Sequence, residues 1–173
     1  MSIRVGINGF GRIGRSFTRA ILARGLMDDV TLAAINDPFG DSDVMAFLLK
    51  HDSVGGTLEH RIAATSSGLD VDGFSITKFE EKDPAAIDWK AAGVDIVIES
   101  TGLFTSREAA AAHLSGGAKK VIISAPSPDA DATICMGVND EVYSRKDHDV
   151  ISNASCTTNC LAPLAKVLDG ALG

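Results

Sequence analysis

Residues 3–14 of the chain, IRVGINGFGRIG, decide the fold. The first half, IRVGIN, is a short run rich in β-branched residues and is typical of a buried strand. The second half contains the pattern Gly-x-Gly-x-x-Gly at Gly9, Gly11 and Gly14. In such a turn the first glycine allows a tight bend, the second lets a pyrophosphate approach the backbone, and the third lets the next helix pack on the strand. A strand followed by this turn and a helix predicts a dinucleotide-binding unit.

The residues that follow extend the unit. Residues 11–24 carry apolar side chains at helical spacing, and the N-terminus of that helix offers N–H groups to phosphates. Residues 30–36, VTLAAIN, predict a second strand that ends at Asp37. A carboxylate at this point can accept both hydroxyls of an adenosine ribose and would repel a 2′-phosphate, which favours NAD over NADP. Asp37 is also compatible with a simple turn before Pro38.

Short β-branched runs alternate with helical patterns along the rest of the chain. We expect helices at 41–50 and about 106–114, and strands at 94–99, 121–124, 133–138 and 150–153. Residues 57–79 alternate around two turn signals, Ser67-Gly68 and Asp72-Gly73, and predict a small antiparallel meander. A last helix begins at about Cys156, with Gly170 as its expected stop. The predicted fold class is α/β, a doubly wound, mostly parallel Rossmann-like sheet with a small antiparallel meander.

Composition narrows the possible partners and compartments. The net charge is −7 and the sixteen Lys and Arg residues are scattered, whereas nucleic acids and anionic membranes require clustered cations. The sequence lacks the ~18 consecutive apolar residues of a membrane span. Its N-terminus, MSIRVGINGF, lacks the long apolar region of a secretory signal. We therefore expect a cytoplasmic protein without nucleic-acid or membrane partners, whose cysteines remain thiols.

The stretch ISNASCTTNC at 151–160 holds two of the three cysteines. A structural zinc site needs about four ligands and only these two thiols are nearby, so we expect no metal site. Packing explains Cys135, inside a predicted apolar strand, and Cys160, one turn into its helix. Cys156 follows a parallel strand and opens a helix, where the dipole favours a thiolate. From the residues alone, Cys156 is either a nucleophile or a packed side chain, and the hydroxyls of Ser155 and Thr157 suit a phosphate.

Five segments carry a resemblance to a known family. They are GINGFGRIGR at 6–15, IND at 35–37, ESTGLF at 99–104, ISAP at 123–126 and SNASCTTNCLAPLAK at 152–166. Together they resemble phosphorylating glyceraldehyde-3-phosphate dehydrogenase over essentially the whole chain. The resemblance implies that Cys156 attacks an aldehyde, that hydride passes to NAD to leave a thioester, and that inorganic phosphate releases an acyl phosphate. It also implies a phosphorylated aldose as substrate and a homotetramer for the full-length protein.

The resemblance also assigns binding residues. Within the turn of Gly9, Phe10 and Gly11, it implies that Arg12 and Ile13 line the pyrophosphate of NAD, with Asp37 on the adenosine ribose. Thr101, Gly102 and Ser124 would lie along the same cleft, and Ser155 and Thr157 would hold substrate or phosphate. Lys82 stands where the family commonly has arginine near the adenine, so a charge remains but the planar fork is lost.

The family's chains are about twice as long, and their catalytic base is a histidine after the cysteine helix. The four histidines here all precede Cys156. We therefore expect residues 1–155 to form the NAD-binding domain and 156–173 to lead to an absent substrate domain, without full catalytic competence in this chain alone. A stand-alone NAD-binding or redox-sensing module, and the cofactor half of an erythrose-4-phosphate dehydrogenase, remain as alternatives.

Overall fold

A nine-stranded sheet forms the centre of the structure, a computed structural model in which residues 2–173 are described. Its strand order is β10-β11-β9-β8-β1-β2-β7-β6-β5. Neighbours from β10 to β7 pair in parallel, and β5, β6 and β7 pair antiparallel. The predicted α/β class, with a mostly parallel sheet and a small antiparallel meander, is confirmed. The meander is not separate, because β7 also pairs with β2 and extends the main sheet.

The elements have the following bounds. The main sheet contains β1 (Ile3–Asn8), β2 (Val30–Asn36), β5 (Ile62–Thr65), β6 (Gly68–Val71), β7 (Phe74–Phe79), β8 (Ile96–Glu99), β9 (Lys120–Ile123), β10 (Ala132–Thr133) and β11 (Val150–Ser152). A second sheet pairs β3 (His51–Asp52) with β4 (Gly56–Thr57). The helices are α1 (Arg12–Ala23), α2 (Ser42–Lys50), α3 (Arg107–Ser115) and α4 (Cys156–Leu172), with 3₁₀ turns η1 (Pro84–Ala86) and η2 (Asp140–Val142).

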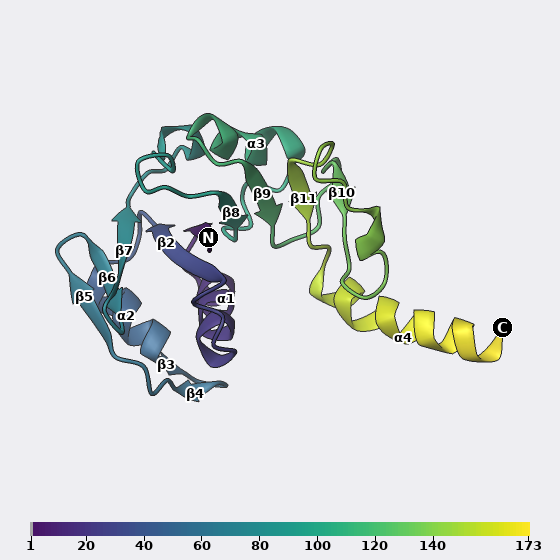
Figure 1. Cartoon of the computed structure of the whole chain (residues 1–173), viewed down its shortest axis with the longest axis horizontal. Helices are drawn as coiled ribbons and strands as arrows, with labels where there is room; N and C mark the ends of the chain where they lie inside the picture. The colour runs from purple at the N-terminus through teal and green to yellow at the C-terminus, as the bar shows by residue number, and fades with distance from the viewer. Residues whose placement is uncertain (1) are drawn as a thin grey trace.

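Helices cover both faces of the sheet. In Figure 1 the sheet curves as an arc, with α1 and α2 on its inner side and α3 on its outer side. Three of the four helices begin at a polar residue, Asp41, Ser106 or Ser155, whose side chain accepts a backbone N–H from the first turn. Such caps satisfy N–H groups that have no partner within the helix. Local capping residues thus determine where these helices begin, and α1 is the exception.

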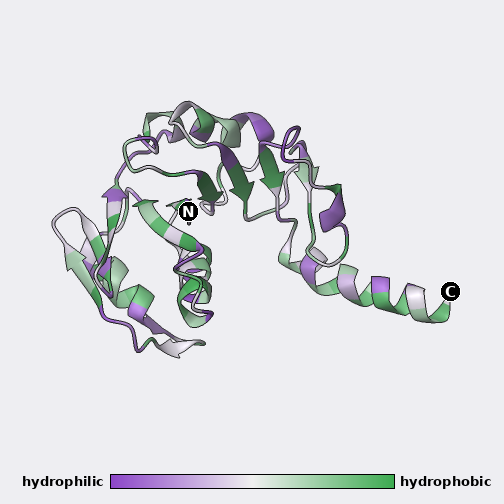
Figure 2. Cartoon of the chain, in the orientation of Figure 1, coloured by the Kyte–Doolittle hydropathy of each residue, from purple (hydrophilic) through white to green (hydrophobic). Residues whose placement is uncertain are grey.

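The core consists of three clusters of buried apolar side chains. The largest joins residues between Val5 and Ile98 under α1, α2 and the meander. The second surrounds Trp89, and the third packs α3 against β9 and β11. Figure 2 shows the central strands as strongly hydrophobic. Because both faces of these strands are buried, their residues are apolar at successive positions and do not alternate between apolar and polar.

Two predicted boundaries are wrong. The expected strand at 133–138 stops at Thr133, because Cys135 donates its backbone N–H to the side chain of Asn139 and accepts one from Val138 in a turn. The expected stop at Gly170 is also absent, since α4 continues to Leu172. At Cys135 a side-chain acceptor competes with the strand, whereas α4 continues because the Gly173 N–H still donates to the carbonyl of Asp169.

The last helix, α4, projects away from the sheet (Figure 1) and contributes no buried side chain. Its apolar residues Leu161, Leu164, Val167 and Leu168 are each more than half exposed. Lys166 links α4 to the loop after β10, where its Nζ donates to two backbone carbonyls. Among residues 2–173, no helix is long and apolar enough to cross a membrane.

Asp131 ties α3 to the strands that precede Cys156. Its carboxylate accepts the side chain of Arg107 at 2.5 Å and the backbone N–H groups of Asp149 and Val150, each at 2.8 Å. Burial alone would raise the pKa of Asp131, but the two backbone donors and Arg107 lower it. The stability that this group contributes is therefore present above the unfolded pKa of about 3.9 and is lost as the pH falls through the lower folded value.

We expect Asp131→Asn to melt a few degrees below the wild type at pH 7, because an amide cannot accept all three donors. The difference should narrow as the pH falls below about 4, where the wild-type carboxylate itself becomes protonated. Thermal unfolding followed by circular dichroism at several pH values measures both effects. Asp28→Asn, a change at an exposed aspartate, is the matched control. A difference that stays constant down to about pH 2 would contradict the role of the Asp131 charge.

Candidate functional site

The glycine turn brings β1, α1 and the loop after β8 into close contact. Gly9 has φ +89°, in the left-handed region that side chains disfavour, and a Cβ there would lie 2.8 Å from the backbone N of Thr101. A Cβ at Gly14 would lie 2.4 Å from the carbonyl oxygen of Gly9. Glycine is therefore required at both positions. At both positions the backbone of the turn lies directly against its neighbours, with no room for a side chain between them.

Helix α1 starts directly at this turn. Gly11 is its N-cap residue, and no side chain accepts a hydrogen bond from the first turn. The unpaired N–H groups and the partial positive charge of the helix dipole face the space beyond the turn. This end of α1 is suited to bind the phosphates of a nucleotide.

Asp37 joins the end of β2 to the glycine turn. Its Oδ2 accepts the backbone N–H of Phe10, and its Oδ1 accepts that of Phe39, both at 3.0 Å. The carboxylate is thereby held in one orientation, and each oxygen keeps a second acceptor position for a hydroxyl. This geometry fits the predicted contact with a ribose.

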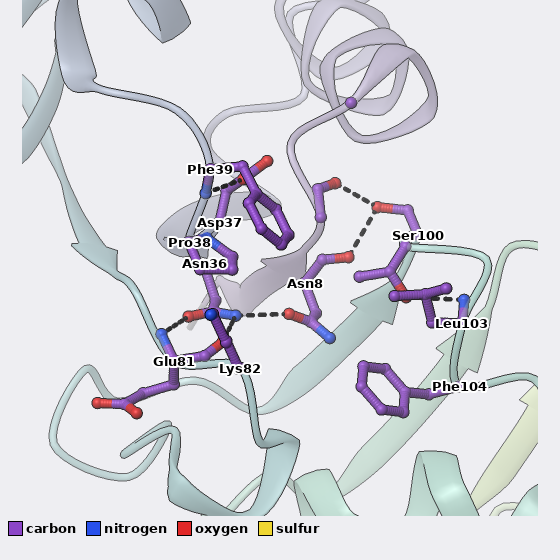
Figure 3. A pocket seen from close by; sticks show the side chains of 13 residues that line it. Asn8, Asn36, Asp37, Pro38, Phe39, Glu81, Lys82, Ser100, Leu103 and Phe104 are labelled. Atoms are coloured by element: carbon purple, nitrogen blue, oxygen red, sulfur yellow. Dashed lines mark hydrogen bonds between the residues drawn. The ribbon is translucent and has the colours of Figure 1, made fainter.

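A cavity of about 440 Å³ opens where the strand order reverses between β1 and β8. Ligands of open α/β sheets bind at such switch points, outside the carboxyl ends of the strands. Figure 3 shows the polar side chains of Asn8 and Asn36 in the middle of the lining, with the rings of Phe39 and Phe104 on either side. The lining residues are Asn8, Gly9, Gly11, Asn36, Asp37, Pro38, Phe39, Glu81, Lys82, Ser100, Thr101, Leu103 and Phe104.

Cys156 lies at the same edge of the sheet. The chain leaves β11 through a turn in which Ala154 has φ +58°, and Cys156 is the first residue of α4. Ser155 caps this helix, with its Oγ accepting the Thr158 N–H at 2.9 Å. The thiol is exposed, so it is available to a small molecule.

The other two cysteines differ from each other. Cys135 is buried as predicted, although in a turn rather than a strand, and its Sγ lies 3.6 Å from Oδ1 of Asn159. The prediction that Cys160 is packed is wrong, because its side chain is exposed. Since α4 projects from the sheet, a position one turn into it reaches no core.

The cavity and Cys156 are separated along one edge. The strand β11, which precedes Cys156, lies three strand positions from β1, with β9 and β8 between them. At about 4.8 Å per position the separation is about 14 Å. Ser124 follows β9 directly and lies between the two sites. The cavity and the thiol therefore lie at the same carboxyl edge of the sheet.

Comparison with known proteins identifies the family. A sequence model described as "Glyceraldehyde 3-phosphate dehydrogenase, NAD binding domain" matches residues 3–107. The chain belongs to this family. The predicted cofactor, NAD, is confirmed, since the matched part is the family's NAD-binding domain.

Full-length relatives extend the match past Cys156. The chain is 54% identical to glyceraldehyde-3-phosphate dehydrogenase of Streptomyces coelicolor over all 173 residues, which cover 51% of that protein. It is 53% identical to glyceraldehyde-3-phosphate dehydrogenase 1 of Bacillus subtilis, again over the whole chain and 50% of the relative. The cytosolic enzyme of Chlamydomonas reinhardtii is 54% identical over 99% of the chain and 49% of its own length. The chain thus spans about half the length of the relatives it matches.

The site residues predicted for this dehydrogenase domain fall into two groups. The cavity brings together Gly9, Gly11, Asp37, Lys82 and Thr101. The rest lie outside its lining: Phe10 is buried beneath the turn, Arg12 and Ile13 are exposed on the first turn of α1, Gly102 follows Thr101, Ser124 follows β9, and Ser155, Cys156 and Thr157 lie at the start of α4.

Several lining residues of this NAD-binding domain were not predicted. Asn8 and Asn36 are the last residues of β1 and β2, and Ser100 follows β8. All three stand at carboxyl ends of adjacent parallel strands, and that position was the available signal. Phe39 and Phe104 carry no such signal, because aromatic residues in loops have no periodicity.

Proposed function

We propose that this chain is the coenzyme-binding half of a phosphorylating aldehyde dehydrogenase in which Cys156 is the nucleophile. The observation that carries this proposal is the shared edge: the Asp37 cavity and the exposed Cys156 thiol open on the same side of one parallel sheet. A bound dinucleotide extended along that edge from Asp37 past Ser124 ends beside the thiol.

The chain's own groups have distinct tasks in this reaction. The Cys156 thiolate adds to the carbonyl carbon of the aldehyde, and the new C–S bond gives an alkoxide that is protonated to a thiohemiacetal. Bound NAD supplies the hydride acceptor. Once that hydroxyl proton and the hydride have left, a thioester remains on Cys156. Inorganic phosphate then attacks the acyl carbon, the C–S bond breaks, and an acyl phosphate leaves the regenerated thiolate.

We assign the two parts of the chain different roles. Residues 1–155 bind NAD, through Gly9, Phe10, Gly11, Arg12, Ile13, Asp37, Lys82, Thr101, Gly102 and Ser124. Residues 156–173 carry the nucleophile and lead to a substrate domain, and Ser155 and Thr157, on either side of Cys156, contact phosphate or substrate. The lack of buried side chains on α4 and the double length of the relatives support this division. The proposed substrate is glyceraldehyde 3-phosphate, the proposed assembly a homotetramer, and the proposed compartment the cytoplasm.

Alkylation tests the nucleophile. We expect iodoacetamide at neutral pH to label Cys156 about two- to fivefold faster than Cys160, because only Cys156 lies at the helix N-terminus, and the dipole contributes about 0.3–1 kcal/mol. Cys135, which is 5% exposed, should react last.

Cys156 and Cys160 lie between Lys146 and Lys166 in one tryptic peptide, so fragment ions must separate the two positions. Cys160→Ser is the control, and its labelling rate should equal that of Cys156 in the wild type. Faster labelling of Cys160 or Cys135 would reject Cys156 as the activated thiol.

A further inference from the structure

Beneath the cavity lies a buried carboxylate that has no Lys or Arg partner among residues 2–173. Glu99, at the end of β8, is 1% exposed. Its Oε2 accepts from Asn8 Nδ2 at 2.6 Å and from His113 Nε2 at 3.0 Å. Its Oε1 accepts from the backbone N–H of Thr101 at 2.8 Å and from the Thr101 hydroxyl. Four donors therefore satisfy the four acceptor positions of one carboxylate.

The protonation states follow from the partners. Trp89 Nε1 can only donate, and it lies 3.1 Å from His113 Nδ1, so Nδ1 accepts and the ring proton is on Nε2. His113 is thus neutral and donates to Glu99. Three of the four partners of Glu99 can only donate in this arrangement, namely the Asn8 amide N–H, His113 Nε2–H and the Thr101 backbone N–H, and the Thr101 hydroxyl completes the set.

From Asn8 the network continues to the opposite wall of the cavity. Asn8 gives its amide N–H to Glu99, so its Oδ1 is left to accept from Asn36 Nδ2 at 2.7 Å. Asn36 also donates to the carbonyl of Glu81 at 2.9 Å, and its Oδ1 accepts the Glu81 N–H at 2.8 Å. Both asparagine amides are therefore held in one orientation, between Glu99 at one end and the backbone of Glu81 at the other. Figure 3 shows the link from Asn8 through Asn36 to Glu81.

We propose that Glu99 is a positioning residue for the coenzyme site, in which one buried carboxylate holds the Thr101 wall and the Glu81–Lys82 wall of the cavity at their binding separation. The inference deepens the function proposed above and depends on it. Glu99 touches no ligand. It acts through Thr101 on one side and through Asn8 and Asn36 on the other, so that the cavity is formed before NAD arrives.

The substitution Glu99→Gln would leave an amide that cannot serve both walls. If the new NH₂ group faced Thr101, the Thr101 backbone N–H would lose its acceptor. If the NH₂ group faced Asn8, the Asn8 amide would have to turn, and its own NH₂ would then oppose that of Asn36. A buried donor without an acceptor is costly, so one cavity wall must move in either case.

The test compares Glu99→Gln with Asp95→Asn in the 173-residue chain. Asp95 precedes the same strand at its amino end, where it accepts from Lys119 and Arg4, far from the cavity. Both changes replace a carboxylate by an amide, and both should lower the melting temperature. Calorimetric titration with NAD should show about tenfold weaker binding for Glu99→Gln and a change within about twofold for Asp95→Asn.

The outcomes separate the two proposals. If the wild type binds no NAD, the coenzyme function itself fails. If the wild type binds and Glu99→Gln binds equally well, or if both variants lose affinity alike, Glu99 is structural only. Should Glu99→Gln fail to fold, hydrogen exchange in the wild type decides: the N–H groups of Thr101 and Glu81 should be protected without NAD. Protection that appears only after NAD is added would overturn the positioning role.

Discussion

A polypeptide of these 173 residues is expected to produce no measurable NADH from glyceraldehyde 3-phosphate, NAD and phosphate. Aldehyde addition to Cys156 requires no further group, but hydride transfer requires a base and an aligned substrate. In the part of the chain that the structure describes, the side chains of all four histidines contact groups other than Cys156. They are His51 with Thr57, His60 with Asp72, His113 with Trp89 and Glu99, and His148 with the N–H of Ser144.

The expected loss of turnover is large. A general base contributes about 10²–10⁴-fold in rate, and loss of substrate positioning removes several kcal/mol more. Together they lower turnover by about 10⁵-fold or more if the two effects are nearly additive. Turnover is measured as absorbance at the NADH band under saturating substrate. The full-length Streptomyces coelicolor enzyme is the positive control.

A chimera provides the complementary result. Fusing this chain to the C-terminal half of the Streptomyces coelicolor protein should restore turnover, and Cys156→Ser in the chimera should abolish it. Cys160→Ser is the matched control and should retain most of the activity. Robust turnover by the 173 residues alone would contradict the prediction, and would mean that a residue such as His148, or one from a second copy, acts as the base.

Asp37 is expected to control which dinucleotide binds. The wild type should bind NAD more tightly than NADP, because the carboxylate accepts ribose hydroxyls and repels a 2′-phosphate. Asp37→Ala should weaken NAD binding by about tenfold to a hundredfold, as expected for hydrogen bonds to a charged group, and should narrow the gap to NADP. Calorimetric titration of both dinucleotides measures the two affinities.

Asp37 also accepts the N–H groups of Phe10 and Phe39. The effect of its charge on binding must therefore be distinguished from its effect on the structure of the two loops. Asp37→Asn keeps one acceptor for these groups and removes the charge. If charge repulsion is the cause, Asp37→Asn should gain affinity for NADP relative to NAD, as Asp37→Ala does. Equal affinity of the wild type for the two dinucleotides would refute the ribose–carboxylate contact.

The sequence was sufficient for the fold because its strongest signals are local. The run IRVGIN, the glycines and the Asp72-Gly73 turn each impose backbone geometry within a few residues, and strand and helix follow in the predicted order. The position of Cys156 at the start of a helix was predictable for the same reason.

What the sequence did not reveal depends on contacts between distant residues. Glu99 contacts Asn8 across 91 positions, and no periodicity marks either residue. The exposure of Cys160 depends on the direction in which α4 leaves the sheet, which no pattern within the helix encodes. The strand expected beyond Thr133 ended because the Asn139 side chain supplied a competing acceptor.

The three core clusters also determine when the sheet can fold during synthesis. The last buried residue along the chain is Ile98 in the cluster around β1, Ala118 in the Trp89 cluster and Val150 in the α3 cluster. The clusters share one sheet and their residues interleave along the chain, so we expect them to fold as one unit. Cys156 follows Val150, the last residue of the three clusters, by six positions, so its thiol leaves the ribosome only after every buried residue has emerged.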